Sequence, residues 1–149
     1  MENLLSPWFK PYIDQGVLAF GMQPDTRLQM IAVVDIGRYG LQAFEKHESL
    51  NGREIDIAGD ELTAPAMARI LSDVAGREIR FQQVPIDEIR KNSDDYALML
   101  EWFDRVGYNA DIEGNLREFG IRPTKFRDWA ARQDWSVAAG AASGAAARS

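Results

Sequence analysis

Side chains that could carry catalytic or metal chemistry are few in this chain of 149 residues. Cysteine is absent and His47 is the only histidine. This excludes thiol catalysis, a disulfide framework and any cysteine-ligated metal site, and it leaves little material for a Ser–His–Asp triad or a histidine cluster. His47 stands among Glu45, Lys46 and Glu48, a context typical of a solvated histidine. The sequence therefore predicts no catalytic residue and no metal ligand.

Motifs that bind nucleotide phosphates are also missing from the sequence. There is no G-x-x-x-x-G-K-[ST], and no G-x-G-x-x-G follows a predicted strand. A Tyr-x-x-x-Lys pair, in which lysine assists a catalytic tyrosine, is missing too. The residues four positions after the four tyrosines are Gly16, Ala43, Leu100 and Ile112. No self-contained enzyme site is visible, so the sequence leaves open whether the protein is an enzyme.

Two further candidate sites each have a structural alternative. Asp56, Asp60 and Glu61 could form an acid/base pair or an oxygen-ligand metal site, but their turn and strand-edge context favours solvated capping groups. Trp102 lies at the margin of the apolar face of a predicted helix. A tryptophan in that position either lines a ligand cleft or packs in the core or against another subunit, and packing is the ordinary role.

The charge balance narrows the classes of partner. There are 23 acidic and 17 basic residues, giving a formal net charge of −6 and a pI near 4.8, which disfavours direct binding to nucleic acid or an anionic membrane surface. No apolar run approaches the ~20 residues that span a bilayer. The first five residues lack the basic start and the cleavage site of a signal peptide. We therefore expect a folded, cytoplasmic protein.

The clearest supersecondary unit runs from residue 54 to residue 84. Glu54–Ala58 alternates as a strand, and Thr63 is placed to cap a helix that has Pro65 in its first turn and ends at Gly76. Glu78–Val84 then resumes a strand. Strand, helix and strand over about 30 residues predict a right-handed parallel crossover, and hence an α/β fold.

An earlier strand and helix are predicted from a β-branched run. Leu28–Val34 is an apolar run apart from Gln29, which favours a strand covered on both faces, as in a parallel sheet. Asp35 is placed to cap a helix over Ile36–Lys46. Gly37 and Gly40 lie inside that helix, where each costs roughly 1 kcal/mol relative to alanine. We expect them to allow close packing onto another element.

Three further segments complete the prediction. Leu4–Ile13 has helical spacing, with a break expected near Lys10 because Pro11 follows it. Ser93 is placed to cap a helix that runs to Val106. Residues 136–149 are rich in Ala, Gly and Ser, which predicts a disordered tail. Before that tail, a last short helix with Thr124 as its cap is expected to dock through Phe126 and Trp129.

Several stretches together resemble the NmrA-like family of atypical short-chain dehydrogenase/reductases. The order and spacing of these stretches make the resemblance specific, and it spans the chain to about Trp135. The first five residues look like the end of the family's "FMEN" segment, and residues 31–37 resemble its "iavdDIG" strand-to-helix junction. Residues 52–63 resemble its "G..ieiaGdelT" strand and capped helix. Its C-terminal end is matched by Trp102, Phe103, Gly107, Tyr108, Thr124, Lys125, Phe126 and Trp129.

The resemblance implies that residues 1–135 are the C-terminal, substrate-cleft part of a Rossmann-type NmrA-like domain with a few mostly parallel strands. Family members begin with a half that carries a glycine-rich G-x-x-G-x-x-G turn, which holds the pyrophosphate of the dinucleotide. The sequence here resembles only the half that follows. We therefore expect a truncated gene product, a mis-called start or a fragment of a longer protein.

The resemblance also implies a cofactor and a cleft. In the family, the "FMEN" segment lies beside the nicotinamide end of NADP or NAD, which makes Met1, Glu2 and Asn3 candidate cofactor contacts. The Asn3 amide can donate to and accept from a carboxamide or a substrate oxygen; its alternative role is to cap a helix ahead of Leu4. The candidate residues of the substrate cleft are Trp8, Tyr12 and Trp102.

The implied function of an intact relative is NAD(P)H-dependent reduction of a small carbonyl, quinone or imine, or sensing of the NADP redox state through a protein partner. This chain alone is expected to be inactive. The alternative is a free-standing, non-enzymatic module that binds a protein or an apolar ligand in a cleft between Leu4–Tyr12 and the Ser93–Val106 helix. If half of the sheet is missing, an unpaired apolar edge remains, and we expect aggregation or homo-oligomerisation.

Overall fold

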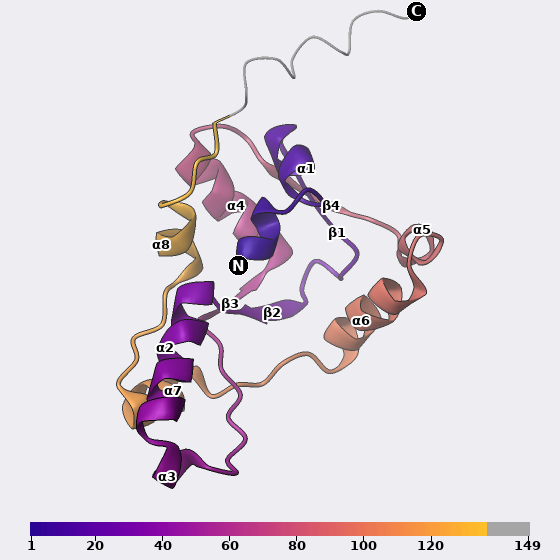
Figure 1. Ribbon diagram of the computed structural model, residues 1–149. Coiled ribbons are helices and arrows are strands. Elements are labelled where there is room, and N and C mark those ends of the chain that lie inside the picture. The colour runs from indigo at the N-terminus through magenta and orange to yellow at the C-terminus, as the bar shows by residue number, and fades with distance from the viewer. Residues whose placement is uncertain (137–149) are drawn as a thin grey trace, which may run out of the picture.

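The computed structural model describes residues 1–136 and contains two small sheets (Figure 1). Strands β1 (Val17–Phe20) and β4 (Arg80–Gln83) pair in parallel. Strands β2 (Arg27–Met30) and β3 (Asp60–Thr63) pair antiparallel. Helices surround both pairs, so the predicted α/β class is confirmed. The predicted tail lies outside the described residues, apart from its first residue.

Nine helical segments accompany the four strands in this part of the chain. Three of them were not predicted: α3, α5 and α7. For α7 the signals were present, since Asp111 caps it by accepting from the Gly114 N–H and Gly120 ends it in the left-handed region. All three missed helices are short, so their periodicity is weak. The helical segments are η1 (Glu2–Leu5), α1 (Lys10–Asp14), α2 (Val33–Glu45), α3 (His47–Leu50), α4 (Ala64–Ala75), α5 (Ile86–Arg90), α6 (Asp94–Arg105), α7 (Ile112–Phe119) and α8 (Phe126–Ala130).

Helix α4 agrees with its prediction at both ends. The Thr63 hydroxyl accepts a hydrogen bond from the Ala66 N–H at 3.3 Å, and Gly76 ends the helix with φ at 64°. Met67 and Leu71 on its inner face are buried. Helix α4 packs against β1, β4 and α8, and so forms the centre of the apolar core. The other large buried core side chains include Leu4, Ile13, Leu18, Ile79, Phe126, Trp129 and Trp135.

The strand predicted over Glu54–Ala58 is wrong. That segment has no strand assignment, and β3 begins at Asp60 instead. The two strands that flank α4 also lie in different sheets, so the predicted parallel crossover between them is wrong. The parallel partner of β4 is β1, far upstream, with Leu18 opposite Phe81. Hydrophobic patterning identifies a strand but does not identify its partner.

The strand predicted over Leu28–Val34 is shorter than expected and pairs in the other direction. Only its first three residues belong to β2, whose partner β3 runs antiparallel. Val33 and Val34 instead begin α2, and both side chains are exposed. Ala32 is the N-cap residue, so the helix starts three residues before its predicted start. The interpretation of this run as a strand covered on both faces was therefore wrong.

Asp35 and the two glycines of α2 also differ from their predictions. Asp35 is not a helix cap: its side chain is fully buried and its carboxylate accepts hydrogen bonds from the Thr124 N–H and the Arg38 guanidinium, both at 2.7 Å. Gly37 and Gly40 do not pack closely, since a Cβ at either position would face open space. The contact with Asp35 fixes the loop before α8 against the start of α2.

The two ends of the described chain fold as short helices. Residues 6–9 separate η1 from α1, so the predicted break falls slightly before its expected position. Phe126 and Trp129 are buried, with ring centroids 5.6 Å apart, which confirms that α8 docks through them. Thr124 is not the cap of α8, because Lys125 occupies that position. Instead, the Thr124 backbone N–H binds the buried Asp35.

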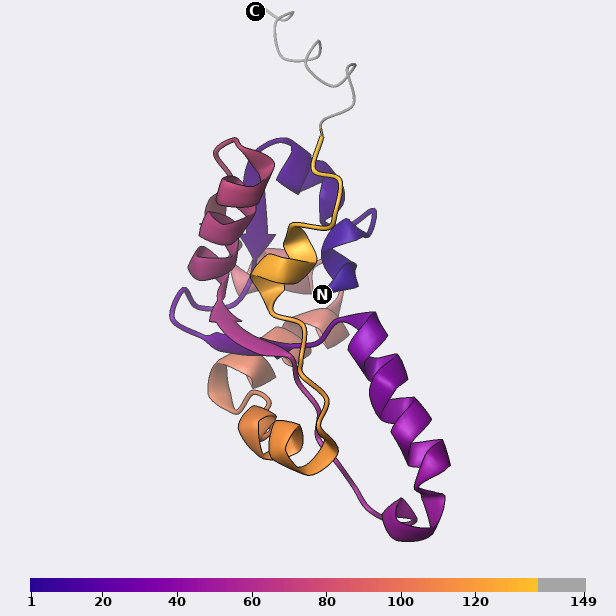
Figure 2. The ribbon, with the colours of Figure 1, turned by 90° about the vertical axis from the view of Figure 1, so that its left-hand side faces the viewer.

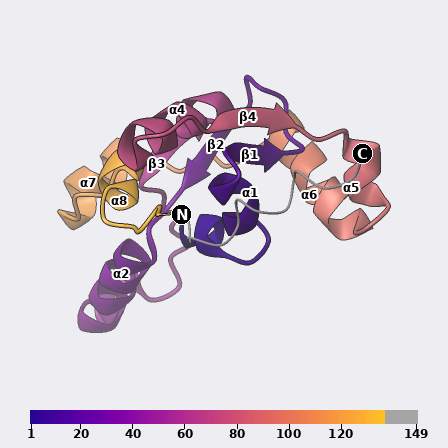
Figure 3. The same cartoon turned by 90° about the horizontal axis from the view of Figure 1, so that it is seen from above.

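The view from above shows how the elements surround the carboxyl ends of the parallel strands (Figure 3). β1 and β4 both point toward α5 and α6, and α1 packs on β1. In parallel α/β sheets, ligands bind outside the carboxyl ends of the strands. Among residues 1–136, no helix is long and apolar enough to cross a membrane.

Candidate functional site

A cavity of about 970 Å³ opens at the carboxyl ends of β1 and β4. Gly21 and Val84, the residues that follow these strands, line it. One wall comes from the N-terminal segment and α1, and the opposite wall from α5 and the start of α6. The cavity is therefore assembled from segments far apart in the sequence. The side chains that form these two walls include Asn3, Ser6, Trp8, Phe9, Tyr12, Ile89, Asn92, Ser93 and Tyr96.

The floor of the cavity follows from the alternation of β1. Successive side chains of a strand point to opposite faces. Leu18 is fully buried in the core, whereas Val17 and Ala19 line the cavity, together with Phe20 at the end of the strand. Gly21 is tightly enclosed, because a Cβ there would meet the Ile89 side chain at 2.3 Å. The small residues Ala19 and Gly21 thus leave space where larger side chains would fill the cavity.

The lining of this cavity is aromatic and polar but carries no ionised side chain. Among the described residues that line it, none is Asp, Glu, Lys, Arg or His. Burial raises the pKa of Tyr96, so its phenol stays neutral at physiological pH. Aromatic walls with a few neutral hydrogen-bonding groups suit a flat, uncharged ligand. The polar side chains available to such a ligand are Asn3, Ser6, Gln15, Gln82, Asn92 and Ser93.

The structure brings three of the six predicted site residues to this cavity. Asn3 lines it, and Trp8 and Tyr12 stand at its rim with 82% and 54% of their side chains exposed. Asn3 lies inside η1, so the alternative role as a helix cap is wrong. Trp102 does not line the cavity. Its ring packs against Phe103 and Tyr108 at centroid distances of 5.5 and 5.3 Å.

Met1 and Glu2 lie next to the cavity but make structural contacts instead of lining it. The Glu2 carboxylate accepts hydrogen bonds from the Val33 N–H at 3.1 Å and from Trp129 Nε1 at 3.1 Å. The backbone nitrogen of Met1 donates to the Ile31 carbonyl at 2.7 Å. These contacts hold the first turn against α2 and α8. Their effect is to fix the position of Asn3 at the cavity.

The contact between Glu2 and α2 predicts a pH-dependent loss of stability in Glu2→Gln. Burial acts to raise the pKa of the Glu2 carboxyl group. Hydrogen bonds from the backbone N–H groups of Glu2 and Val33, together with the adjacent N-terminal ammonium, outweigh the effect of burial, so the pKa is lowered below 4.5. The charge therefore stabilises the fold above pH 4.5, and this stabilisation is lost as the pH falls through the folded-state pKa. At pH 7 we expect Glu2→Gln to lower the free energy of unfolding by about 0.5–1 kcal/mol.

Urea denaturation between pH 7 and pH 3 tests this expectation. The difference between the wild type and Glu2→Gln should shrink as the pH falls below 4.5. Glu54→Gln, which changes an exposed glutamate, is the control and should behave as the wild type. A Glu2→Gln difference that stays constant over this range would contradict a role for the carboxylate charge.

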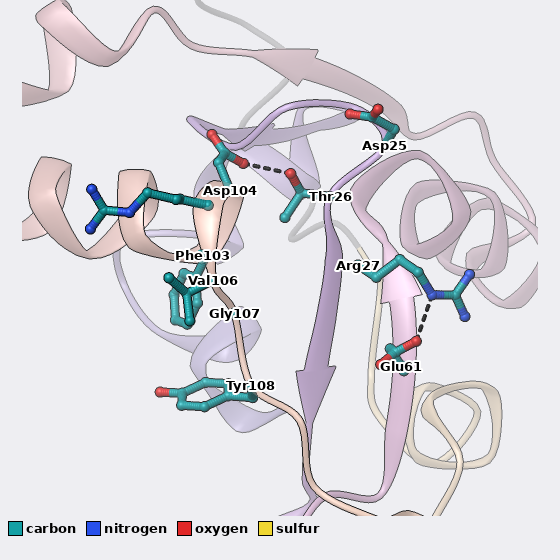
Figure 4. Close-up of a pocket in the computed structure, with 10 residues that line it drawn as sticks. Asp25, Thr26, Arg27, Glu61, Phe103, Asp104, Val106, Gly107 and Tyr108 are labelled. Carbon is teal, nitrogen blue, oxygen red and sulfur yellow. Dashed lines mark hydrogen bonds and ion pairs between the residues drawn. The ribbon is translucent and has the colours of Figure 1, made fainter.

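A second cavity of about 360 Å³ lies between the C-terminal end of α6 and the β2–β3 pair (Figure 4). Four of its polar side chains are engaged in pairs, Asp104 with Thr26 and Glu61 with Arg27. Asp104 accepts hydrogen bonds from the Thr26 hydroxyl at 2.5 Å and the Gln23 N–H at 2.9 Å. Glu61 forms an ion pair with Arg27 at 2.5 Å. These contacts join α6 to the strands, so we interpret this cavity as structural.

The remaining candidates from the sequence also have structural roles. Asp60 accepts a hydrogen bond from the Phe126 N–H at 2.9 Å and lies 3.6 Å from the Lys125 ammonium. Asp56 is exposed, and its carbonyl accepts from the Asn115 amide. His47 is exposed at the start of α3. Within residues 1–136 no group of three or more metal-ligating side chains comes together.

Comparisons with known proteins agree with this α/β architecture. The fold resembles a solved Rossmann-like structure, a nucleoside-diphosphate-sugar epimerase from Staphylococcus aureus, with a TM-score of 0.68 and 20% sequence identity. The aligned region covers 87% of this chain and 48% of that one, so the chain spans about half the length of the structure that it matches. A search of curated proteins finds no match.

The family assignment is more specific than the fold. The model of the NmrA-like family matches residues 1–131, which is most of the chain. The protein therefore belongs to the NmrA-like family, as the sequence motifs predicted.

Proposed function

We propose that this chain is the C-terminal, substrate-side part of an NmrA-like NAD(P)-binding protein. The whole protein would either reduce a small carbonyl or quinone with NAD(P)H or sense the NADP redox state. The observation that carries the proposal is the cavity at the carboxyl ends of β1 and β4. Its position is where α/β sheets bind ligands, and its uncharged aromatic lining suits a quinone or a nicotinamide ring.

The residues present fit one end of the dinucleotide. Asn3 and Ser6, on the N-terminal wall, offer neutral donors and acceptors for a carboxamide. A pyrophosphate needs cationic or backbone N–H donors, and the cavity lining holds no basic side chain. The chain therefore fits the nicotinamide end, and the phosphates would need a second, glycine-rich half.

In the reductase version of this function, the reduced nicotinamide supplies a hydride. The residues of this chain bind and orient the acceptor. Trp8 and Tyr12 at the rim cover an aromatic acceptor and exclude water from it. The neutral Tyr96 phenol and the Ser93 hydroxyl are available as hydrogen-bond donors to a carbonyl oxygen.

The second candidate function is a free-standing module that binds an apolar ligand without a nucleotide. One observation favours it: the cavity is built entirely from residues of this chain, including both of its walls. Such a module would bind an aromatic compound but give no response to NADPH. The two candidate functions therefore differ in whether the chain binds NADPH.

Titration with NADPH, followed by the fluorescence of the reduced nicotinamide, tests the proposal. We expect weak binding to the wild type, and about fivefold weaker binding to Asn3→Ala, because about 1 kcal/mol is lost with one hydrogen bond. Asn109→Ala, at another exposed asparagine, is the matched control and should bind as the wild type. A chain that unfolds cooperatively but leaves the NADPH fluorescence unchanged would favour the module.

A further inference from the structure

Helix α6 carries two apolar faces. Ala97 and Leu100 on one face are buried against the body of the protein. A surface helix ordinarily has a single apolar stripe, which faces the core, and a polar face toward the solvent. The opposite face of α6 instead carries a second apolar stripe, because Leu98, Trp102 and the C-cap residue Val106 follow one another at helical spacing.

This second stripe is open to solvent. Leu98 is 50% exposed and Val106 is 61% exposed. Met99 lies beside them and is exposed as well, and the exposed Tyr108 packs its ring on Trp102 at 5.3 Å, which widens the surface. Figure 1 places α5 and α6 on the opposite side of the sheets from α2 and α8, and Figure 2, which looks from the side of α2, shows α6 behind the sheets. Contiguous exposed apolar side chains of this kind mark interaction surfaces.

Two opposite charges are placed symmetrically about the middle of the stripe. Position 100 is midway between Leu98 and Trp102, and it is also midway between Asp95 and Arg105. Both charged side chains are exposed. When two copies of such a helix pack antiparallel about a twofold axis at this position, the Leu98 side chain of each copy lies opposite Trp102 of the other, and Asp95 lies opposite Arg105. A twofold contact requires a surface that is complementary to itself, and this stripe fulfils that requirement.

We infer that α6 pairs antiparallel with α6 of a second copy of this chain, so that the protein forms a dimer with twofold symmetry. The dimer contains two apolar contacts between Leu98 and Trp102 and two ion pairs between Asp95 and Arg105. The symmetric placement of the charges favours a second copy over a different protein, which would not require it. The contact gives Trp102 the role against another subunit that the sequence left open.

The acidic charge of the chain is compatible with this contact. Each copy carries a formal charge of −6, but at physiological ionic strength the repulsion between exposed charges is screened beyond about 8 Å. The two other acidic residues beside the stripe, Asp94 and Glu101, are both paired with Arg90. The exposed apolar side chains form a patch on the order of several hundred Å², below the roughly 800 Å² per partner of a standard interface. We therefore expect a weak dimer with a dissociation constant in the micromolar range.

The dimer contact lies on the other side of α6 from the cavity. Tyr96 on this helix and its N-cap residue Ser93 line the cavity. Helices α5 and α6 pack chiefly against each other. A second copy bound to the stripe would therefore support this wall of the cavity from outside and leave the cavity itself open.

Sedimentation velocity of the full chain over a series of concentrations tests the inference. We expect a monomer–dimer equilibrium for the wild type and at least a tenfold larger dissociation constant for Leu98→Glu. Leu41→Glu is the matched control, since Leu41 on α2 is 58% exposed, close to the value for Leu98. It should dimerise as the wild type does, and circular dichroism checks that both variants are folded.

Two charge variants test the antiparallel register. Asp95→Lys places two basic side chains opposite each other, and Arg105→Glu places two acidic ones, so each variant alone should dimerise at least about fivefold more weakly than the wild type. An equimolar mixture of the two variants brings opposite charges together at both positions. It should regain most of the wild-type affinity, which a loss of folding in either variant could not produce.

Three results would overturn the inference. These are a wild type that stays monomeric at millimolar concentration, a dimer that Leu98→Glu leaves intact, or a mixture of the charge variants that regains no affinity. A dimer that only Leu41→Glu dissociates belongs to the second of these results and would assign the contact to α2. Dimerisation is measured without cofactor or substrate, so these outcomes are independent of the NADPH titration that tests the proposed function.

Discussion

Asp35→Ala is expected to lower the free energy of unfolding by about 2–4 kcal/mol. The Asp35 carboxylate is fully buried and accepts hydrogen bonds from the Thr124 N–H and the Arg38 guanidinium. Alanine would leave the buried N–H without a partner and would remove the link between α2 and the loop that leads into α8. The loss is a large part of the stability of a domain, which is typically about 5–15 kcal/mol. Urea denaturation at pH 7, followed by circular dichroism, measures it.

Two variants separate the parts of this effect. Asp35→Asn keeps an oxygen that can accept from the Thr124 N–H but loses the charge that faces Arg38, so we expect a smaller loss than for alanine. Arg38→Ala removes the half-exposed partner but leaves the buried Asp35 carboxylate bound to the Thr124 N–H, so we expect a loss smaller than that of Asp35→Ala. If Asp35→Ala unfolds at the same urea concentration as the wild type, this buried contact is not important for stability.

Asp35 also shows where sequence reasoning fails. An aspartate before an apolar helix is an ordinary N-cap, and nothing local distinguishes it from a buried acceptor. Its partner is the backbone N–H of residue 124, which is distant in the sequence. Thr63 was predicted correctly because its cap contact reaches only three residues ahead, to Ala66. Local contacts could be predicted, and distant ones could not.

The strands also show that a local pattern can be predicted from the sequence and a distant partner cannot. The pattern of Glu78–Val84 indicated a strand, and β4 forms inside that range. The pattern of Glu54–Ala58 was equally good, yet no strand forms there. A strand needs a partner for its backbone groups as well as an alternating sequence. Within the described residues β4 finds that partner in β1, whereas residues 54–58 find none.

Only part of the candidate site could be predicted from the sequence. Asn3 was reached through the family resemblance, and Trp8 and Tyr12 as side chains of the N-terminal segment expected to line a cleft. All three lie at the cavity. The opposite wall includes Ile89, which lies in α5, a helix too short to be predicted from periodicity. Trp102 was expected to line the cleft as well. It does not line the cavity, because its ring packs against Phe103 and Tyr108.

Filling the cavity should abolish ligand binding without unfolding the chain. Ala19 is half-buried on β1 with its side chain toward the cavity, so phenylalanine there would occupy the space between the two walls. With 1,4-naphthoquinone as the probe, we expect Ala19→Phe to weaken binding at least tenfold, which is about 1.4 kcal/mol. Quenching of tryptophan fluorescence measures it, since Trp8 stands at the rim.

The control for this variant must add the same side chain elsewhere. Ala43→Phe places it on the exposed surface of α2, outside the cavity, and should bind naphthoquinone as the wild type does. Because the new ring of Ala19→Phe enters open space, its thermal unfolding should stay close to that of the wild type. Equal binding by Ala19→Phe and the wild type would place the quinone elsewhere and would remove the main support for a substrate site in this cavity.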